Sequence, residues 1–239
     1  MMVNNDTLFD PHAVSELVRA ALADPQAGII VPKVFYYDAP RSIWAAGARY
    51  RRFPAAIVLK KTRGEDDGRF DAETHLEFTP FCVGVFSRKM LDSAGLLDSG
   101  YHFYYEDYDL CIRAKSAGFT IRFEPKAHIW HKISKTIRGG KKTEFWRVYG
   151  RSHGIFCQKF PFHPYVANRF SRWYLQARTL YEGRLSGLEA FRKAFLEGLE
   201  AELTPPPRWR EVDEPAMLEV RLPGSADVTE SNEGGRLTT

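Results

Sequence analysis

The sequence predicts an α/β fold followed by a helical C-terminal region, and two observations carry this prediction. Short apolar runs typical of buried strands alternate with helix patterns over the first half of the 239 residues. Between residues 144 and 203, by contrast, the apolar positions keep a helical spacing. A chain of this size, 44% hydrophobic and 27% charged, can form one substantial core with an appended helical part.

The N-terminal elements alternate as strand, helix and strand. The apolar residues 1–3 predict a short strand that ends at the polar Asn4-Asn5-Asp6 stretch. Pro11 suits the first turn of a helix, in which apolar residues recur at helical spacing up to Asp24-Pro25. The continuous apolar run 28–34 then predicts a buried strand.

The middle of the chain is less regular. Residues 36–74 lose periodicity and gather glycine and proline, so we expect a long excursion that includes a short hairpin. Residues 76–86 return to the composition of a strand. Long loops of this kind are often functional.

Two helices and a strand complete the first half. Ser87 caps the first helix and Gly95 ends it. The second helix covers residues 106–117 and ends at Gly118, and residues 119–123 form a strand.

The C-terminal half is predicted to be helical until a run of three prolines ends the ordered part. The expected helices cover residues 144–157, 164–181 and 186–203. We therefore divide the chain into a sheet domain, residues 1–131, a basic helical region, residues 132–207, and an acidic tail with little fixed structure, residues 208–239.

The net charge of +4 is unevenly distributed. The chain holds 16 basic and 17 acidic residues up to His131, then 16 and 6 in residues 132–210, then 2 and 7 in residues 211–239. The basic segment is therefore where an anionic partner is expected, either a diphosphate or a lipid surface. A solvated helix face would give the same pattern.

Cysteine usage and the lack of export signals predict a cytoplasmic protein. Cys82, Cys111 and Cys157 form no CxxC pair, so they are expected to be reduced, buried thiols. The sequence has no run of 18 apolar residues and no signal-peptide pattern. A peripheral position at the inner face of the plasma membrane is left open.

The densest group of titratable residues is Glu106, Asp107 and Asp109 at a predicted helix start. Carboxylates at that position are favoured by the helix dipole and can cap free backbone N–H groups. The functional alternative is that one of them, held among aromatic residues, is a general base that takes a proton from a hydroxyl.

Asp6 and His131 are the candidates for a metal site. Asp6 stands at a strand end, where ligands bind in open α/β sheets, although an Asn/Asp cluster is also common in turns. His131 follows an aromatic residue, and a lone histidine in that position is more often structural than a ligand. Carboxylate oxygen and imidazole nitrogen together suit a divalent cation.

Eight short segments of the chain follow one another in a characteristic order. They are Asn4-Asn5-Asp6-Thr7, Asp24-Pro25, Gly28 to Lys33, Ser87 to Leu91, Gly95 to Asp98, Tyr105 to Ala114, Gly118-Phe119 and Trp130-His131-Lys132. In this order they resemble the segments of family 2 glycosyltransferases, with the closest similarity to the rhamnosyltransferase-like branch. The resemblance covers about residues 3–160.

The resemblance implies a GT-A fold and a role for each matching residue. Asn4, Asn5 and Asp6 match the donor-binding, DxD-like motif, so Asp6 would coordinate Mg²⁺ or Mn²⁺ on the donor diphosphate, and His131 would join that metal site. Asp107, in the Glu106-Asp107 motif, would be the general base. Further contacts to diphosphate or acceptor would come from Trp130, Lys132 and Arg151.

The implied reaction moves a sugar, with inversion, from a nucleotide-sugar donor to a glycan or lipid-diphosphate-linked acceptor in cell-envelope or surface polysaccharide synthesis. Two features depart from the family pattern. Thr79-Pro80-Phe81-Cys82 replaces a Thr-Gly-Ala-like stretch, and the first nucleotide-binding half that precedes the Asn-Asn-Asp motif is expected to be missing or supplied by a second chain.

Other hypotheses remain open. The chain could be a non-catalytic remnant or a partner subunit of a transferase, or a nucleic-acid-binding protein, although no nucleic-acid motif supports the last. The helix expected from Pro164 has one aromatic face, and Arg169, Arg172 and Arg178 lie away from it. That face is predicted either to lie on an anionic membrane or to pack against the sheet domain.

Overall fold

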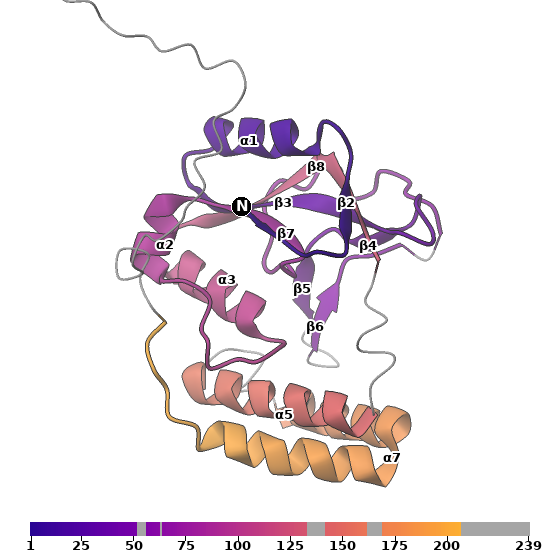
Figure 1. The fold of residues 1–239 in the computed structure, drawn as a ribbon, viewed down its shortest axis with the longest axis vertical. Coiled ribbons are helices and arrows are strands. Elements are labelled where there is room, and N and C mark those ends of the chain that lie inside the picture. Colours follow the sequence, from indigo (N-terminus) through magenta and orange to yellow (C-terminus); the bar gives the residue numbers. More distant parts are fainter. Residues whose placement is uncertain (52–55, 63, 133–141, 162–168, 207–239) are drawn as a thin grey trace, which may run out of the picture.

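The computed structural model describes residues 1–51, 56–62, 64–132, 142–161 and 169–206. A mixed sheet forms the body, α1 covers one of its faces, α2 and α3 cover the other, and α5 and α7 form a helical layer beyond α3 (Figure 1). The predicted mixed α/β, GT-A-like class is confirmed.

The described elements occur in the following order. The strands are β1 (Met2–Val3), β2 (Thr7–Phe9), β3 (Ala27–Tyr36), β4 (Ile43–Ala45), β5 (Ala48–Arg51), β6 (Ala56–Leu59), β7 (Val83–Phe86) and β8 (Thr120–His131). The helices are α1 (Ala13–Ala23), α2 (Arg88–Ala94), α3 (Glu106–Ser116), α5 (Lys142–Lys159) and α7 (Arg169–Leu199).

The central strand β3 explains why the sequence contains a long apolar run. The sheet order is β1-β7-β3-β8-β2, with β3 parallel to β8 and antiparallel to β7. Ile29 and Val31 face the α2–α3 side, whereas Ile30 and Val34 face α1. Because successive side chains of a strand point to opposite faces, burial on both faces requires apolar residues throughout.

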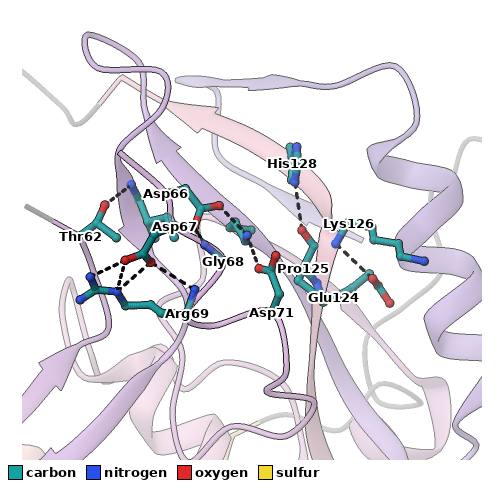
Figure 2. A network of polar contacts seen from close by, with 12 residues as sticks. Thr62, Asp66, Asp67, Gly68, Arg69, Asp71, Glu124, Pro125, Lys126 and His128 are labelled. Atoms are coloured by element: carbon teal, nitrogen blue, oxygen red, sulfur yellow. Dashed lines mark hydrogen bonds and ion pairs between the residues drawn. The ribbon is translucent and has the colours of Figure 1, made fainter. Parts of the chain in front are cut away.

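Pro32 interrupts this central strand and coincides with a change of register. Pro32 pairs with Glu124, but Lys33 pairs with His128, so β8 contains extra residues at this point. The extra segment is held by its own bonds, because Lys126 N donates to Glu124 Oε1 (3.2 Å) and His128 Nε2 contacts Pro125 O (3.0 Å; Figure 2). A bulge is the usual way to accommodate proline inside a sheet.

The same region carries an acidic loop that the buried Lys33 holds in place. Lys33 Nζ lies 2.6 Å from Asp66 Oδ2 and also pairs with Asp71. Burial alone would lower the pKa of Lys33, but the bonds to these two carboxylates outweigh it and raise the pKa. Part of the predicted excursion is therefore an ordered loop beside the bulge (Figure 2).

The predicted helix ends are confirmed for α2 and α3. The Ser87 side chain accepts a hydrogen bond from Met90 N (3.2 Å), and Gly95 follows the last turn of α2 with φ 77°. Gly118 follows α3 with φ 86°. Glycine suits both positions because this backbone conformation is strained for other residues.

The extents of several strands differ from prediction. The hairpin is present as β5 and β6, but of the expected strand 76–86 the part in the sheet is Val83–Phe86. The expected strand 119–123 continues to His131, because the bulge restores its pairing with β3 beyond Glu124. Sequence periodicity misses this continuation because Pro125 and Lys126 interrupt it.

Helix α7 doubles back on itself. Arg192 Nη2 donates to Gln176 Oε1 at 2.7 Å, whereas residues 16 apart in a straight helix would be about 24 Å apart. The chain therefore reverses between these residues, where the sequence predicts a break between helices 164–181 and 186–203. We refer to the two parts as the first and second limbs of α7.

Glycines let α5 approach the second limb of α7 closely. A Cβ atom at Gly154 would lie 2.3 Å from Phe195 O, and one at Gly150 would lie 2.5 Å from Phe191 O. The pair shares an aromatic core with the loop that leads to α3, including Tyr105, Trp146 and Phe156. The basic helical region thus packs on the segment that carries Glu106 and Asp107. The expected acidic tail, residues 208–239, lies outside the described residues.

Candidate functional site

Strand pairing brings Asp6 and His131 together. Thr7 of β2 pairs with His131 of β8, and Lys132 N donates to Asp6 O at 2.9 Å. As a result Asp6 Oδ1 lies 3.1 Å from His131 Nε2, in a position that does not meet hydrogen-bond geometry. The two residues that the sequence assigns to a metal are thus neighbours at one edge of the sheet.

The atoms of this pair are suited to a divalent cation. Asp6 Oδ1 and His131 Nδ1 are buried and lack hydrogen-bond partners among the described residues. The described residues contain no cluster of three or more His, Cys, Asp or Glu side chains that could hold a metal ion. A pair is nevertheless enough for Mg²⁺, which commonly binds through one or two carboxylates while phosphates and water complete its shell.

Further aromatic and basic side chains lie near the Asp6–His131 pair, but not all of them point toward it. The rings of Trp44 and His131 make an edge contact with centroids 4.8 Å apart. Lys132 Nζ lies 4.8 Å from the centre of the Tyr37 ring. Trp130 Nε1 donates to Pro40 O at 3.0 Å, so its indole anchors a neighbouring loop.

Asn4 and Asn5 form the exposed turn between β1 and β2. Asn4 N donates to Cys82 O (2.8 Å) and Asn4 O accepts from Thr7 Oγ1 (2.7 Å). Both contacts hold the backbone of the turn, so the Asn side chains are not required for its shape.

The approach to α3 has an unusual backbone. Tyr104 and Tyr105 have φ values of 69° and 70°, a left-handed conformation that is costly for bulky residues. The Tyr105 ring is buried against Tyr149, His153 and Phe156, and Tyr105 Oη donates to Tyr149 Oη at 3.0 Å. Packing on α5 therefore holds the strained turn that starts α3.

Asp107 has an enclosed carboxyl in a residue that is only half-buried. Protein atoms surround the carboxyl, while the residue as a whole keeps intermediate exposure. Burial, followed by the charge of Glu106, raises the pKa of Asp107 to about 8, although hydrogen bonds from the Tyr108 and Phe81 backbones act in the opposite direction. A carboxyl with a strongly raised pKa, in a residue that is not fully buried, is characteristic of functional sites.

Glu106 and Asp109 differ from Asp107 in their surroundings. Burial raises the pKa of Glu106, and its Oε2 atom lacks a hydrogen-bond partner among the described residues. Asp109 is fully buried, accepts a hydrogen bond from Tyr101 Oη (3.1 Å) and pairs with Arg113 and Lys159. Of the three carboxylates, Asp109 is therefore structural.

The buried thiol of Cys82 links the two halves of the site. Burial raises the pKa of Cys82 to about 12, and the charges of both Asp6 and Asp107 add to that shift. Cys82 is therefore within electrostatic reach of both carboxylates. The metal candidate and the base candidate consequently lie around one shared neighbour.

A family model described as glycosyl transferase family group 2 matches residues 1–195. The chain belongs to this family. The match covers the sheet domain, α5 and most of α7, and supports glycosyl transfer as the general activity. No curated protein matches the chain.

In this family 2 glycosyltransferase, Arg151 lies apart from the Asp6–His131 pair. Its Nη1 atom donates to Gly100 O at 2.8 Å, which ties α5 to the loop before α3. Arg151 also lines a pocket of about 260 Å³ together with His102, Arg147, Val148 and Ser152. The predicted contact residue Arg151 thus belongs to a basic pocket.

Sequence patterns did not reveal the buried ion network that joins the two parts of this glycosyltransferase. Lys159, at the end of α5, lies 2.6 Å from Asp98 Oδ2 and pairs with Asp109 of α3. The residues are far apart in the sequence, and no short-range spacing signals such a network. Three buried, free cysteines, by contrast, agree with the predicted thiols.

Proposed function

We propose that the chain is a metal-dependent, inverting glycosyltransferase that uses a nucleotide-sugar donor. The observation that carries the proposal is the enclosed Asp107 carboxyl, whose pKa is raised and whose charge, like that of Asp6 in the Asp6–His131 pair, acts on Cys82. A general base and a cation site that share Cys82 as a neighbour suit displacement at an anomeric carbon. The base would activate the acceptor hydroxyl, and the cation would stabilise the leaving group.

In the proposed reaction, Asp107 in its ionised form accepts the proton of an acceptor hydroxyl. The acceptor oxygen forms a bond to the anomeric carbon while the bond from that carbon to the donor phosphate oxygen breaks, and the electron pair leaves with the nucleoside diphosphate. Attack opposite the leaving group inverts the anomeric configuration. A carboxyl with a pKa near working pH can both take up and return this proton.

Asp6 and His131 would hold Mg²⁺ or Mn²⁺, which when bound would stabilise the negative charge on the leaving diphosphate. The proposal is supported by the distance of 3.1 Å between Asp6 Oδ1 and His131 Nε2. It is also supported by Asp6 Oδ1 and His131 Nδ1, which are buried and lack hydrogen-bond partners among the described residues. Lys132, beside this pair, would add a positive charge.

We assign the acceptor to the glycan or lipid-diphosphate class, in cell-envelope or surface polysaccharide synthesis. The supporting feature is the pocket lined by His102, Arg147 and Arg151, whose two arginines offer cationic donors for phosphate next to the loop that leads to α3. A rhamnosyl or hexosyl donor follows from the motif resemblance.

The test is release of nucleoside diphosphate from a panel of nucleotide sugars, with Mg²⁺, with Mn²⁺ and with EDTA. Proton NMR of the first product formed identifies its anomer. We expect turnover that requires metal and a product of inverted configuration. Absence of metal-dependent turnover would contradict catalysis by this chain and favour the partner-subunit alternative, and a retained configuration would contradict the role of Asp107.

A further inference from the structure

The aromatic side chains of the helical layer differ in what they contact. Trp173 and Tyr181 of α7 are 77% and 91% exposed, so the expectation that this face packs against the sheet domain is wrong for these two residues. No described helix is long and apolar enough to cross a membrane. Tyr149 of α5 is instead half-buried and packs on the loop that leads to α3.

Tyr149 contacts both residues of the left-handed turn that precedes α3. The centroid of its ring lies 5.3 Å from that of Tyr104 and 5.3 Å from that of Tyr105. Tyr105 Oη also donates a hydrogen bond to Tyr149 Oη (3.0 Å). A single side chain of α5 therefore packs on both strained residues and is hydrogen-bonded to one of them.

Two further bonds from α5 fix the loop before this turn. Arg151 Nη1 donates to Gly100 O (2.8 Å) and Ser152 Oγ donates to Phe103 O (2.7 Å). These bonds hold the backbone of the loop, but neither reaches the two left-handed residues. A left-handed conformation is costly for a bulky side chain and persists only where the surrounding contacts maintain it. The contacts of Tyr149 are placed to do so.

The left-handed turn determines where α3 begins. Asp109 N donates to Tyr105 O (2.8 Å), so the first turn of α3 closes on the carbonyl of a left-handed residue. Asp107 lies within this first turn, and Tyr108 N donates to its Oδ1 atom at 2.8 Å. A hydrogen bond from the Phe81 backbone holds the same carboxyl from the loop before β7. The carboxyl keeps both bonds only while the start of α3 keeps its place beside that loop.

We propose that Tyr149 is a positioning residue for sugar transfer, which holds Tyr104 and Tyr105 in the left-handed turn and thereby keeps the Asp107 carboxyl where it receives the acceptor proton. The proposal rests on the function proposed above, in which Asp107 is the base. Tyr149 acts through the turn and exchanges no proton with the substrate. Helix α5 thus affects the rate of transfer as well as the stability of the chain.

The surroundings of Asp107 determine what the loss of Tyr149 would change. Titratable neighbours of Asp107 include Glu106 and Cys111 of α3 and Cys82 before β7. Burial is the largest cause of the raised pKa of Asp107. If the turn relaxes, water reaches the carboxyl and its pKa falls toward the ordinary value of an aspartate. A substitution of Tyr149 leaves the titratable neighbours unchanged, so such a fall reports an altered environment of the carboxyl itself.

The experiment compares Tyr149→Ala, which removes the ring and the hydroxyl, with Tyr149→Phe, which keeps the ring. We expect Tyr149→Ala to lower kcat by about 10–100-fold while the donor KM stays within about threefold of the wild-type value. The pH at which the rate levels should move below the wild-type value of about 8. Tyr149→Phe should restore kcat to within about fivefold of the wild type, because it lacks only the bond from Tyr105.

The matched control is Phe160→Ala. Phe160 follows α5, is half-buried in the same aromatic core and contacts Phe156. Its removal should lower the melting temperature without moving kcat or the pH profile. Circular dichroism shows whether each variant folds. If Tyr149→Ala does not fold, Tyr149→Leu, which keeps apolar bulk without the ring and the hydroxyl, takes its place.

A second measurement does not depend on turnover. Carbon-13 NMR of a chain with labelled aspartate carboxyls gives the pKa of Asp107 without substrate, and Asp107→Asn assigns its signal. We expect this pKa to be lower by about one pH unit or more in Tyr149→Ala than in the wild type, and unchanged in Phe160→Ala.

The outcomes separate this proposal from the proposed function. A wild-type chain without turnover would contradict the proposed function, and with it a catalytic effect of Tyr149, whatever the NMR result. With an active wild type, the positioning role is overturned if Tyr149→Ala keeps the wild-type kcat and pH profile. It is also overturned if the pKa of Asp107 is the same in Tyr149→Ala and the wild type, or if Phe160→Ala lowers kcat as much as Tyr149→Ala does.

Discussion

Asp6 Oδ1 and His131 Nε2 lie 3.1 Å apart because the turn after β1 and the end of β8 meet through the short pairing of β2 with β8. The proposed cation site depends on this pairing. Its two ligands come from the first and last segments of the sheet domain, and the intervening strands fix their separation.

Removal of either ligand is expected to weaken metal binding and turnover together. Asp6→Ala and His131→Ala should each lower kcat/KM by about 10²-fold or more, because leaving-group charge would lose its stabilisation. Mn²⁺ binding measured by electron paramagnetic resonance should weaken in parallel. Asp10→Ala, at the half-buried position after β2 where the carboxylate accepts a hydrogen bond from His12 N, is the control and should retain Mn²⁺ binding. Unchanged Mn²⁺ affinity in both site variants would exclude this pair as the metal site.

The raised pKa of Asp107 predicts a dependence of stability on pH. Between the pKa of an unfolded Asp, about 4, and the folded value of about 8, the native state holds a proton that the unfolded state has lost. The free energy of unfolding should therefore fall as pH rises through this window. Above about pH 8, the ionisation of Asp107 should change it little.

Asp107→Asn removes that titration. The melting temperature of the variant relative to the wild type should rise from pH 5 to about pH 8 and then level off. Differential scanning calorimetry across pH measures this difference. A constant difference would mean that Asp107 titrates alike in the folded and unfolded chain.

The ion network at Lys159 is predicted to contribute to stability. Lys159→Met would leave the carboxylates of Asp98 and Asp109 with less compensation in a buried site, and should cost about 3–5 kcal/mol in the free energy of unfolding. Urea denaturation measures the change. Arg147→Met, which breaks the exposed pair with Glu144, is the matched control and should have little effect. Equal effects of the two variants would rule out a special role of the buried network.

The close approach of α5 and the second limb of α7 predicts intolerance of larger residues. Gly154→Leu would place side-chain atoms where Phe195 O and Gly198 lie, and should destabilise the chain by about 3 kcal/mol or more. Gly64→Ala serves as the control because a Cβ there meets no atom within 4 Å. Thermal denaturation compares the two, and a Gly154→Leu variant as stable as Gly64→Ala would contradict the close packing.

Helix ends could be predicted from the sequence, whereas features that depend on contacts between distant residues could not. The caps at Ser87, Gly95 and Gly118 follow from residue types and their neighbours, and so does the break within α7. The continuation of β8 past Pro125 depends on pairing with β3, which no local pattern encodes.

The candidate site also combines features that could be predicted from the sequence with features that could not. The motifs identified Asp6, Asp107 and His131 by type and order, but their relation through Cys82 depends on the sheet. The left-handed Tyr104 and Tyr105 were not predictable either, because packing on α5 overrides the backbone preference of tyrosine.

The role of Asp107 as the base is tested by the pH dependence of metal-dependent nucleotide-sugar turnover in the wild type and in Asp107→Asn. We expect a wild-type rate that increases about tenfold for each pH unit below about 8 and then levels, because the ionised form of Asp107 is the active base. The Asp107→Asn rate should be lower by about 10²–10⁴-fold. An Asp107→Asn variant with the rate and pH profile of the wild type would contradict the proposed role of Asp107.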